Sequence, residues 1–104
     1  MGERTYKVIV SARSMRMLGE HISFLAKVNK AAAAKTKKTI LDAFQSLSRM
    51  PNRFPFLSSP YLPENKYHKM YVAKWYIVLY QIRDNEVFID FILDCRKDYQ
   101  WLIP

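Results

Sequence analysis

The chain has 104 residues, half of them apolar, and a formal net charge of +8. This length suits one compact domain spanning residues 1–104, and the apolar content argues against intrinsic disorder. The apolar runs are too short to cross a bilayer, and the start lacks the long apolar stretch of a secretory signal, so we expect no membrane partner. A lone cysteine, Cys95, cannot form an intrachain disulfide, which fits a cytoplasmic location.

The positive charge is concentrated in the first half of the chain. Up to Arg53 there are 11 lysines and arginines against three acidic residues, whereas the remainder has six of each kind. Such a surface suits either the phosphates of a nucleic acid or an acidic protein partner, because both are attracted by the same long-range field. Charge alone therefore leaves both kinds of partner open.

Alternating β-branched and aromatic residues in "TYKVIV" predict a first strand at residues 6–10. Ser11 is a suitable N-cap for a helix reaching about residue 27, and Asn29 is a suitable cap for a second helix. Apolar residues recur at three- and four-residue spacing in both segments, and in the second they continue to Met50, before Pro51. The short link between the helices predicts an antiparallel hairpin.

Four of the five prolines lie between residues 51 and 63. Each proline fixes its own φ and removes a backbone donor, so this segment is predicted to be neither a helix nor an interior strand. Its phenylalanines, leucines and tyrosine indicate a rigid connector that packs over one edge of the core.

Three strands are predicted after the connector, at residues 66–72, 75–82 and 87–93. The first two pair through a tight turn at Ala73 and Lys74, and "RDNE" supplies the second turn. Strict alternation in the last strand would place Val87, Ile89, Phe91 and Leu93 on one face, and Phe88, Asp90, Ile92 and Asp94 on the other. The expected fold is α+β: the helical hairpin packs on one face of an antiparallel sheet, in which the first strand joins a three-strand meander.

Metal and cofactor chemistry is not indicated. One cysteine and two separated histidines give no zinc spacing, no carboxylate cluster suggests magnesium, and two glycines cannot form a phosphate-binding loop. We therefore expect no metal and no small-molecule cofactor. Continued alternation turns Cys95 toward the interior, where a small apolar filler is expected.

Several stretches together resemble the RelE/ParE superfamily of bacterial toxins: "YKVIVSARS", "FP", "YHKMYVAKWYIVLYQIRDNEVFIDFIL" and "CRKDY". Members of such families tend to show a skeleton of the form Y-R-K, then Y-R-I-x-Y, then R-R-D-Y. In this chain the matching positions are Tyr67, His68 and Lys69, then Tyr76, Ile77, Val78 and Tyr80, then Arg96, Lys97, Asp98 and Tyr99.

The resemblance implies a type II toxin whose sheet curves around a shallow basic concavity, and a cognate antitoxin that wraps and silences it. The candidate catalytic residues are Arg96, Tyr99, Lys69, Lys74 and His68. Arg96 is the candidate phosphate contact, because its forked donors match phosphate geometry. Tyr99 is suited to stacking on a base or donating to an oxygen.

The resemblance leaves three functions open. The first, which we favour from the sequence, is ribosome-dependent cleavage of messenger RNA, which would make the protein a metal-independent endoribonuclease. The second is inhibition of DNA gyrase by binding, as in the ParE branch, and the third is a degenerate toxin that only binds its antitoxin. Ile77 stands where RNA-cleaving members usually have an arginine, which favours binding or a modified nuclease, whereas the Lys, Arg and Tyr cluster favours RNA.

Overall fold

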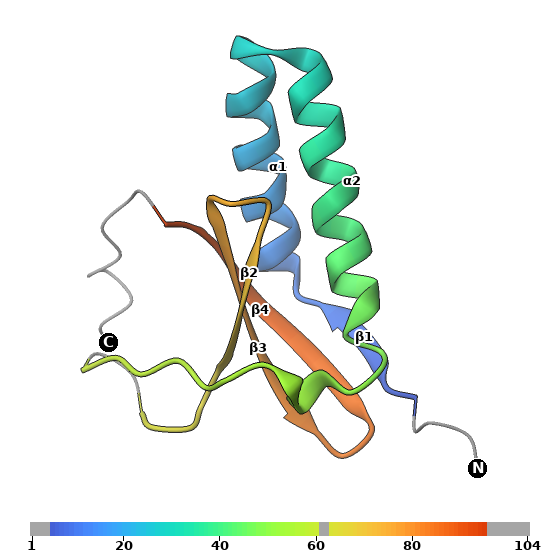
Figure 1. Cartoon of the computed structure of the whole chain (residues 1–104), viewed down its shortest axis with the longest axis vertical. Coiled ribbons are helices and arrows are strands. Elements are labelled where there is room, and N and C mark those ends of the chain that lie inside the picture. The colour runs from blue at the N-terminus through green and yellow to red at the C-terminus, as the bar shows by residue number, and fades with distance from the viewer. Residues whose placement is uncertain (1–4, 61–62, 96–104) are drawn as a thin grey trace.

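The computed structural model describes residues 5–60 and 63–95. Its elements follow the predicted order, and the four strands form one sheet in the order β1-β4-β3-β2 (Figure 1). The α+β class, the hairpin and the three-strand antiparallel meander are confirmed. The elements are β1 (Lys7–Val10), α1 (Ala12–Val28), α2 (Lys30–Ser46), a 3₁₀ turn (Pro51–Arg53), β2 (His68–Val72), β3 (Tyr76–Arg83) and β4 (Glu86–Asp94).

The sheet is mixed, so the prediction of an antiparallel sheet is wrong for β1. This strand pairs in parallel with β4, with Val8 opposite Val87 and Val10 opposite Ile89. The helical hairpin, the connector and two strands lie between β1 and β4 in the sequence, so no tight turn forces these two strands to run antiparallel. The N-terminal strand thus covers one edge of β4.

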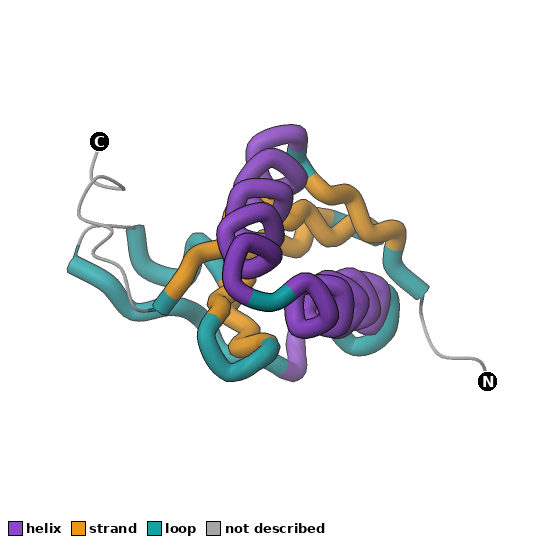
Figure 2. Tube along the Cα trace, turned by 90° about the horizontal axis from the view of Figure 1, so that it is seen from above, coloured by secondary structure: helices purple, strands orange, loops and turns teal. Residues whose placement is uncertain are grey.

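Both helix caps were predicted correctly. The Ser11 hydroxyl accepts from the N–H of Ser14 at 3.0 Å, and the Asn29 side-chain oxygen accepts from the N–H of Ala32 at 3.0 Å. Because Asn29 separates the helices alone, they run side by side in opposite directions (Figures 1 and 2). The second helix ends at Ser46, earlier than predicted.

The connector packs on the outer edge of β2, as predicted. The N–H of Leu57 donates to the carbonyl oxygen of Tyr67 at 2.7 Å, and the N–H of Lys69 donates to that of Pro55 at 2.9 Å. These bonds satisfy backbone groups that an edge strand would otherwise expose. The prolines therefore still permit a short stretch of ladder-like pairing, together with one 3₁₀ turn.

One face of the sheet is covered by the two helices and contains the larger core. Its buried members come from α1, from α2 and the residue that follows it, and from the meander strands, and β1 packs against them. The buried apolar residues are Leu18, Ile40, Phe44, Leu47, Met70, Val72, Tyr76, Val78, Tyr80, Val87, Ile89 and Ile92.

The predicted alternation of β4 is wrong after Ile89. The register between β3 and β4 shifts so that Leu79 lies opposite Phe91 while Tyr80 lies opposite Ile89, leaving Asp90 as an extra residue. Such a bulge moves every later side chain to the other face. Ile92 consequently joins the helix-covered core, while Phe91 and Leu93 enter a second cluster on the opposite face.

The extra residue of the bulge has no partner in β3, but its backbone oxygen accepts hydrogen bonds from other donors. The carbonyl oxygen of Asp90 accepts from the Ser11 hydroxyl at 3.4 Å and from Nε of Arg13 at 3.3 Å. Both donors come from the beginning of α1, a distant part of the sequence. The pattern of residues along β4 alone therefore could not predict these two donors.

Candidate functional site

We call the sheet surface opposite the helices the far face. It contains a smaller apolar cluster of Tyr67, Leu79, Phe91 and Leu93, against which Ile77 and Leu57 pack. Cross-strand partners project to the same side, so Lys69, opposite Leu79, and Tyr71, opposite Ile77, also belong to this face. The far face therefore combines apolar contacts with polar side chains at its surface.

A hydrogen-bonded carboxylate lies at the bulge on the far face. One oxygen of Asp90 accepts from the Tyr67 hydroxyl at 3.0 Å and from Nε2 of Gln81 at 2.8 Å. Burial, and after it the negative charge of Asp90, raise the pKa of Tyr67 to about 12. The phenol is therefore protonated near neutral pH and acts as a donor rather than as a base.

Four cations contact aromatic rings of the far face. The guanidinium carbon of Arg13 lies 4.0 Å from the centre of the Phe91 ring, and that of Arg83 lies 5.7 Å from Phe88. Lys66 and Lys69 contact the rings of Tyr67 and Tyr71 at 5.5 and 5.8 Å. Arg13 and Arg83 both act electrostatically on Tyr67, where they oppose the rise in its pKa. The far face thus carries several cations together with one hydrogen-bonded carboxylate.

Arg13, Lys66, Arg83 and Asp90 were not among the predicted site residues. Arg13 and Arg83 both lie within the stretches that carry the family resemblance, but neither occupies a position of the Y-R-K, Y-R-I-x-Y and R-R-D-Y skeleton from which the candidate residues were chosen. A usable signal did exist for Asp90, since it is a single charged residue inside the apolar run "VFIDFIL". A charge in such a run indicates either solvent exposure or a bulge.

Two predicted lysines lie far apart. Lys69 is in β2 on the far face, whereas Lys74 lies in the turn between β2 and β3 with φ of 70°. Three strand residues, Met70–Val72, and the turn residue Ala73 lie between them, and the strand from Lys69 to Val72 alone spans roughly 10 Å. Lys74 instead lies near the end of β4, where the N–H of Cys95 donates to the carbonyl oxygen of Trp75 at 2.7 Å.

His68 projects to the helix-covered side rather than toward Lys69. Only 8% of its surface is exposed, and its ring stacks on Tyr80 and contacts Phe56 at a centroid distance of 4.1 Å. Its Nδ1 donates to the carbonyl oxygen of Phe54 at 2.7 Å. Through these contacts His68 attaches the connector to the sheet.

The other two predicted site residues, Arg96 and Tyr99, lie outside the described residues, as do Lys97 and Asp98. The prediction that Cys95 faces the interior is wrong, because the residue is exposed. The strand ends at Asp94, and the bulge has already reversed the order of faces on which that prediction relied. The thiol sits at the surface beside the last residues of β4.

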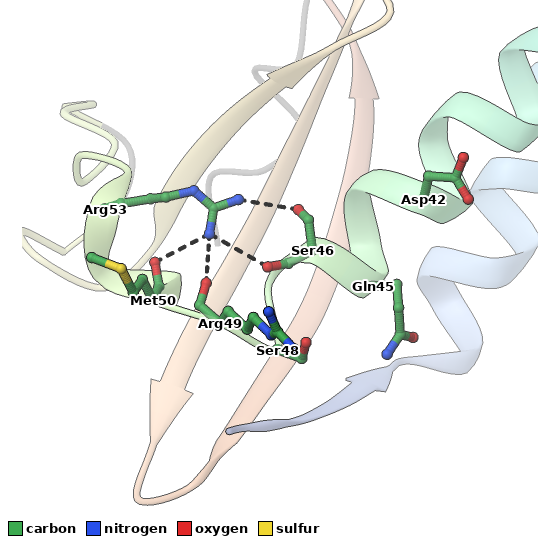
Figure 3. A pocket seen from close by; sticks show the side chains of 7 residues that line it. All are labelled: Asp42, Gln45, Ser46, Ser48, Arg49, Met50 and Arg53. Carbon is green, nitrogen blue, oxygen red and sulfur yellow. Dashed lines mark hydrogen bonds between the residues drawn. The ribbon is translucent and has the colours of Figure 1, made fainter. Parts of the chain in front are cut away.

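A separate hollow of about 610 Å³ lies at the C-terminal end of α2, and Arg53 dominates it (Figure 3). Its guanidinium donates to the carbonyl oxygens of Arg49 at 2.6 Å and Met50 at 3.2 Å, and to the Ser46 hydroxyl at 3.1 Å. These groups include the free acceptors that a helix leaves at its end. The hydrogen bonds of Arg53 thus terminate α2, and its guanidinium is not a free cation in the hollow.

Within the described residues, no group of three or more His, Cys, Asp or Glu side chains is placed to hold a metal ion. In the same part of the chain, no helix is both long and apolar enough to cross a membrane.

Comparison with protein families places this fold and surface in context. Residues 8–99 match the model described as "ParE toxin of type II toxin-antitoxin system, parDE". The chain belongs to this family. A solved structure titled "Chromosomal ParDE TA system from P. aeruginosa" is similar to it with a TM-score of 0.71 at 13% identity, covering 88% of this chain and 97% of the other. No curated protein matches the chain significantly.

The match makes this protein a ParE-family toxin of a type II toxin–antitoxin system, a family whose members partner an antitoxin. The RelE/ParE resemblance predicted from the sequence is therefore confirmed. The structural similarity, at 13% identity, independently supports the fold of the hairpin and sheet.

Proposed function

We propose that this toxin arrests growth by binding and inhibiting DNA gyrase through the far face, with residues 1–104 acting as one toxin unit in the cytoplasm. Inhibition by binding requires a complementary surface but no bond-breaking residues. The far face offers exposed Tyr71 and a rim of Arg13, Lys66, Lys69 and Arg83. Aromatic residues and arginine are the types enriched where protein interfaces gain most of their energy.

The environment of Ile77 carries this proposal. Ile77 lies on the far face and packs against the cluster of Tyr67, Leu79, Phe91 and Leu93. In the RNA-cleaving members that the chain resembles, an arginine at this position helps stabilise the reacting phosphate. The absence of one such donor costs on the order of 10²–10³ in rate. An apolar contact at this position therefore favours a surface built for protein binding.

The groups available for proton transfer support the same choice. Cleavage by the 2′-hydroxyl of RNA needs one group to accept a proton and another to donate one. His68 is enclosed on the other side of the sheet, and Tyr67 is held protonated by burial and by Asp90. One carboxylate oxygen of Asp90 already accepts two hydrogen bonds, from Tyr67 and from Gln81.

Ribosome-dependent cleavage of messenger RNA is the second candidate. The observation in its favour is the basic rim of four cations, which suits a phosphate backbone as well as an acidic protein surface. In this alternative Lys69 and Arg96 would contact phosphate, Lys74 would contribute positive charge, and Tyr99 would contact a base or an oxygen. His68 would have to leave its contacts with Phe54 and Tyr80 to take part.

Induced expression distinguishes these functions. Messenger RNA ends and trapped gyrase–DNA cleavage complexes are to be measured in the same cultures. We expect trapped gyrase with intact transcripts, whereas cuts in register with codons and no trapped gyrase would establish the nuclease instead. Arg96→Ala is expected to abolish toxicity under both schemes. Absence of any growth arrest from the wild-type protein would indicate a degenerate toxin.

A further inference from the structure

The β2–β3 hairpin carries two exposed aromatic rings, each with a lysine over its face. Trp75, in the turn, is 41% exposed, and Nζ of Lys74 lies 5.0 Å from the centre of its ring. Tyr71, in β2, is 62% exposed, and Nζ of Lys69 lies 5.8 Å from its ring. The two aromatic residues flank the last residue pair of the ladder between β2 and β3. We call these four residues the β-hairpin patch.

The backbone of the turn shows that Lys74 does not serve local stability. Ala73 and Lys74 adopt φ of 51° and 70°, in the left-handed region. Hairpin turns prefer glycine or asparagine at such positions, because a Cβ atom is crowded there. Residues held in this conformation against their preference are concentrated at functional sites. The turn therefore presents the side chain of Lys74 although a glycine would suit its backbone better.

The charge of this hairpin favours a nucleic acid over a protein as its ligand. Residues 65–83 include three lysines and one arginine but no acidic residue. Both cations of the β-hairpin patch are lysines, which are depleted at protein–protein interfaces, whereas arginine is enriched there. Lysines neutralise phosphates, and aromatic rings that stack on bases hold an unpaired strand without reading its sequence.

The nearest carboxylate across the ladder lies on the other side of the sheet. Asp94 is opposite Tyr76 in β4, and only 5% of its surface is exposed. It lines a cavity on the helix-covered side together with His21 and Tyr76. The lysines and rings of the β-hairpin patch are thus presented without an exposed carboxylate on their own hairpin.

We propose that the β-hairpin patch binds a single strand of DNA within the gyrase–DNA complex. Lys69 and Lys74 contact phosphates, and Tyr71 and Trp75 stack on unpaired bases. Binding tolerates any sequence, since every base has a face on which a ring can stack. This role rests on gyrase being the target, and it adds that the toxin contacts the nucleic acid as well as the enzyme.

The first test uses the full-length toxin and a fluorescein-labelled oligonucleotide of single-stranded DNA. Anisotropy is measured over a range of salt concentrations, and thermal melting shows that each variant folds. Trp75→Ala removes a stacking ring but no charge, so it should weaken binding roughly 5- to 150-fold with an unchanged salt dependence. Lys74→Gly removes one phosphate contact, so the slope of log affinity against log salt should become shallower by about 0.7.

Ala73→Gly is the matched control for Lys74→Gly. Both variants place glycine at a position of positive φ, so both should melt at or above the temperature of the wild type. Only Lys74→Gly should weaken binding to the oligonucleotide. An equal loss in Ala73→Gly would show that the shape of the turn matters rather than the lysine, and would overturn Lys74 as a phosphate contact.

A second test, with purified gyrase and duplex DNA, separates this inference from the proposed function. If Trp75→Ala and Lys74→Gly trap gyrase–DNA cleavage complexes as well as the wild type does, the β-hairpin patch does not contact the DNA, while gyrase stands as the target. If the wild type binds the oligonucleotide but traps no gyrase, the proposed function is wrong and the strand-binding patch is upheld. A wild-type toxin that does not bind the oligonucleotide, or that binds RNA of the same sequence more tightly, would overturn DNA as the ligand.

Discussion

Polar side chains on the two faces of the sheet differ in their hydrogen-bond partners. On the helix-covered face Ser14, His68 and Tyr80 each donate to a backbone carbonyl oxygen, of Ile89, Phe54 and Pro51 respectively. On the far face Arg13 likewise donates to a backbone carbonyl oxygen, but Tyr67 and Gln81 donate to another side chain, the carboxylate of Asp90. Hydrogen bonds from side chains to the backbone hold helices and strands in place. A hydrogen-bond network among side chains can rearrange without moving the backbone. This difference favours the far face as the surface that acts on a target.

The largest expected effect comes from the helix-covered face. Ile89 is fully buried there, so Ile89→Ala should lower the free energy of unfolding by about 2–5 kcal/mol. Ile77→Ala on the far face, where the side chain is only partly buried, should cost distinctly less. Urea unfolding followed by circular dichroism measures both. Equal losses would show that the two faces contribute alike to stability.

The next effect tests the network at the bulge. Asp90→Ala removes the acceptor of two hydrogen bonds and should cost about 1–3 kcal/mol, because the hydroxyl of Tyr67 and the amide of Gln81 lose their partner. Asp90→Asn keeps one acceptor oxygen and serves as the milder control. In both variants the pKa of Tyr67 should fall, since the charge of Asp90 helps to raise it. If the phenol of Tyr67 titrates in these variants as it does in the wild type, this network is contradicted.

Alkaline pH should destabilise the fold through both faces. Burial raises the pKa of Tyr80 to about 12, and burial together with Asp90 does the same for Tyr67, from an ordinary value of 10.0. The folded protein then holds these protons more tightly than the unfolded chain, so their stabilisation is complete below pH 10 and is lost as the pH rises toward 12. Denaturant midpoints across this range measure the decline. Tyr67→Phe and Tyr80→Phe should each make it shallower; a decline as steep in the double variant would exclude these phenols as its cause.

The smallest effect on stability is expected at Lys69. Its side chain is partly exposed and contacts the ring of Tyr71, so Lys69→Met should change the free energy of unfolding by no more than about 0.5 kcal/mol. If the far face acts on the target, the same variant should lose toxicity in a growth assay. Lys38→Met, on the outer surface of α2, is the matched control and should remain toxic. Full toxicity of folded Lys69→Met would remove Lys69 from the working surface.

Local patterns along the chain predicted much of the fold. Ser11 and Asn29 were recognisable as caps because their side chains satisfy the first free N–H groups of the helix that follows. The turn at Ala73 and Lys74 was placed correctly, although both residues adopt positive φ, which is unusual for these residue types. Among the candidate site residues, sequence reasoning grouped Lys69 with His68, but the two side chains face opposite sides of the sheet.

The amino-acid sequence by itself determined the order of elements, the helix boundaries to within a few residues and the toxin family, because capping, periodicity and turn chemistry act between near neighbours. Tertiary structure decided the parallel pairing of β1, the bulge at Asp90 and the exposure of Cys95. Each of these depends on groups distant in the chain: Ser11 and Arg13 bind the carbonyl oxygen that the bulge leaves unpaired. A shift of one residue in a strand exchanges its faces, so the bulge, at which these two donors bind, decides which side chains of β4 reach the far face.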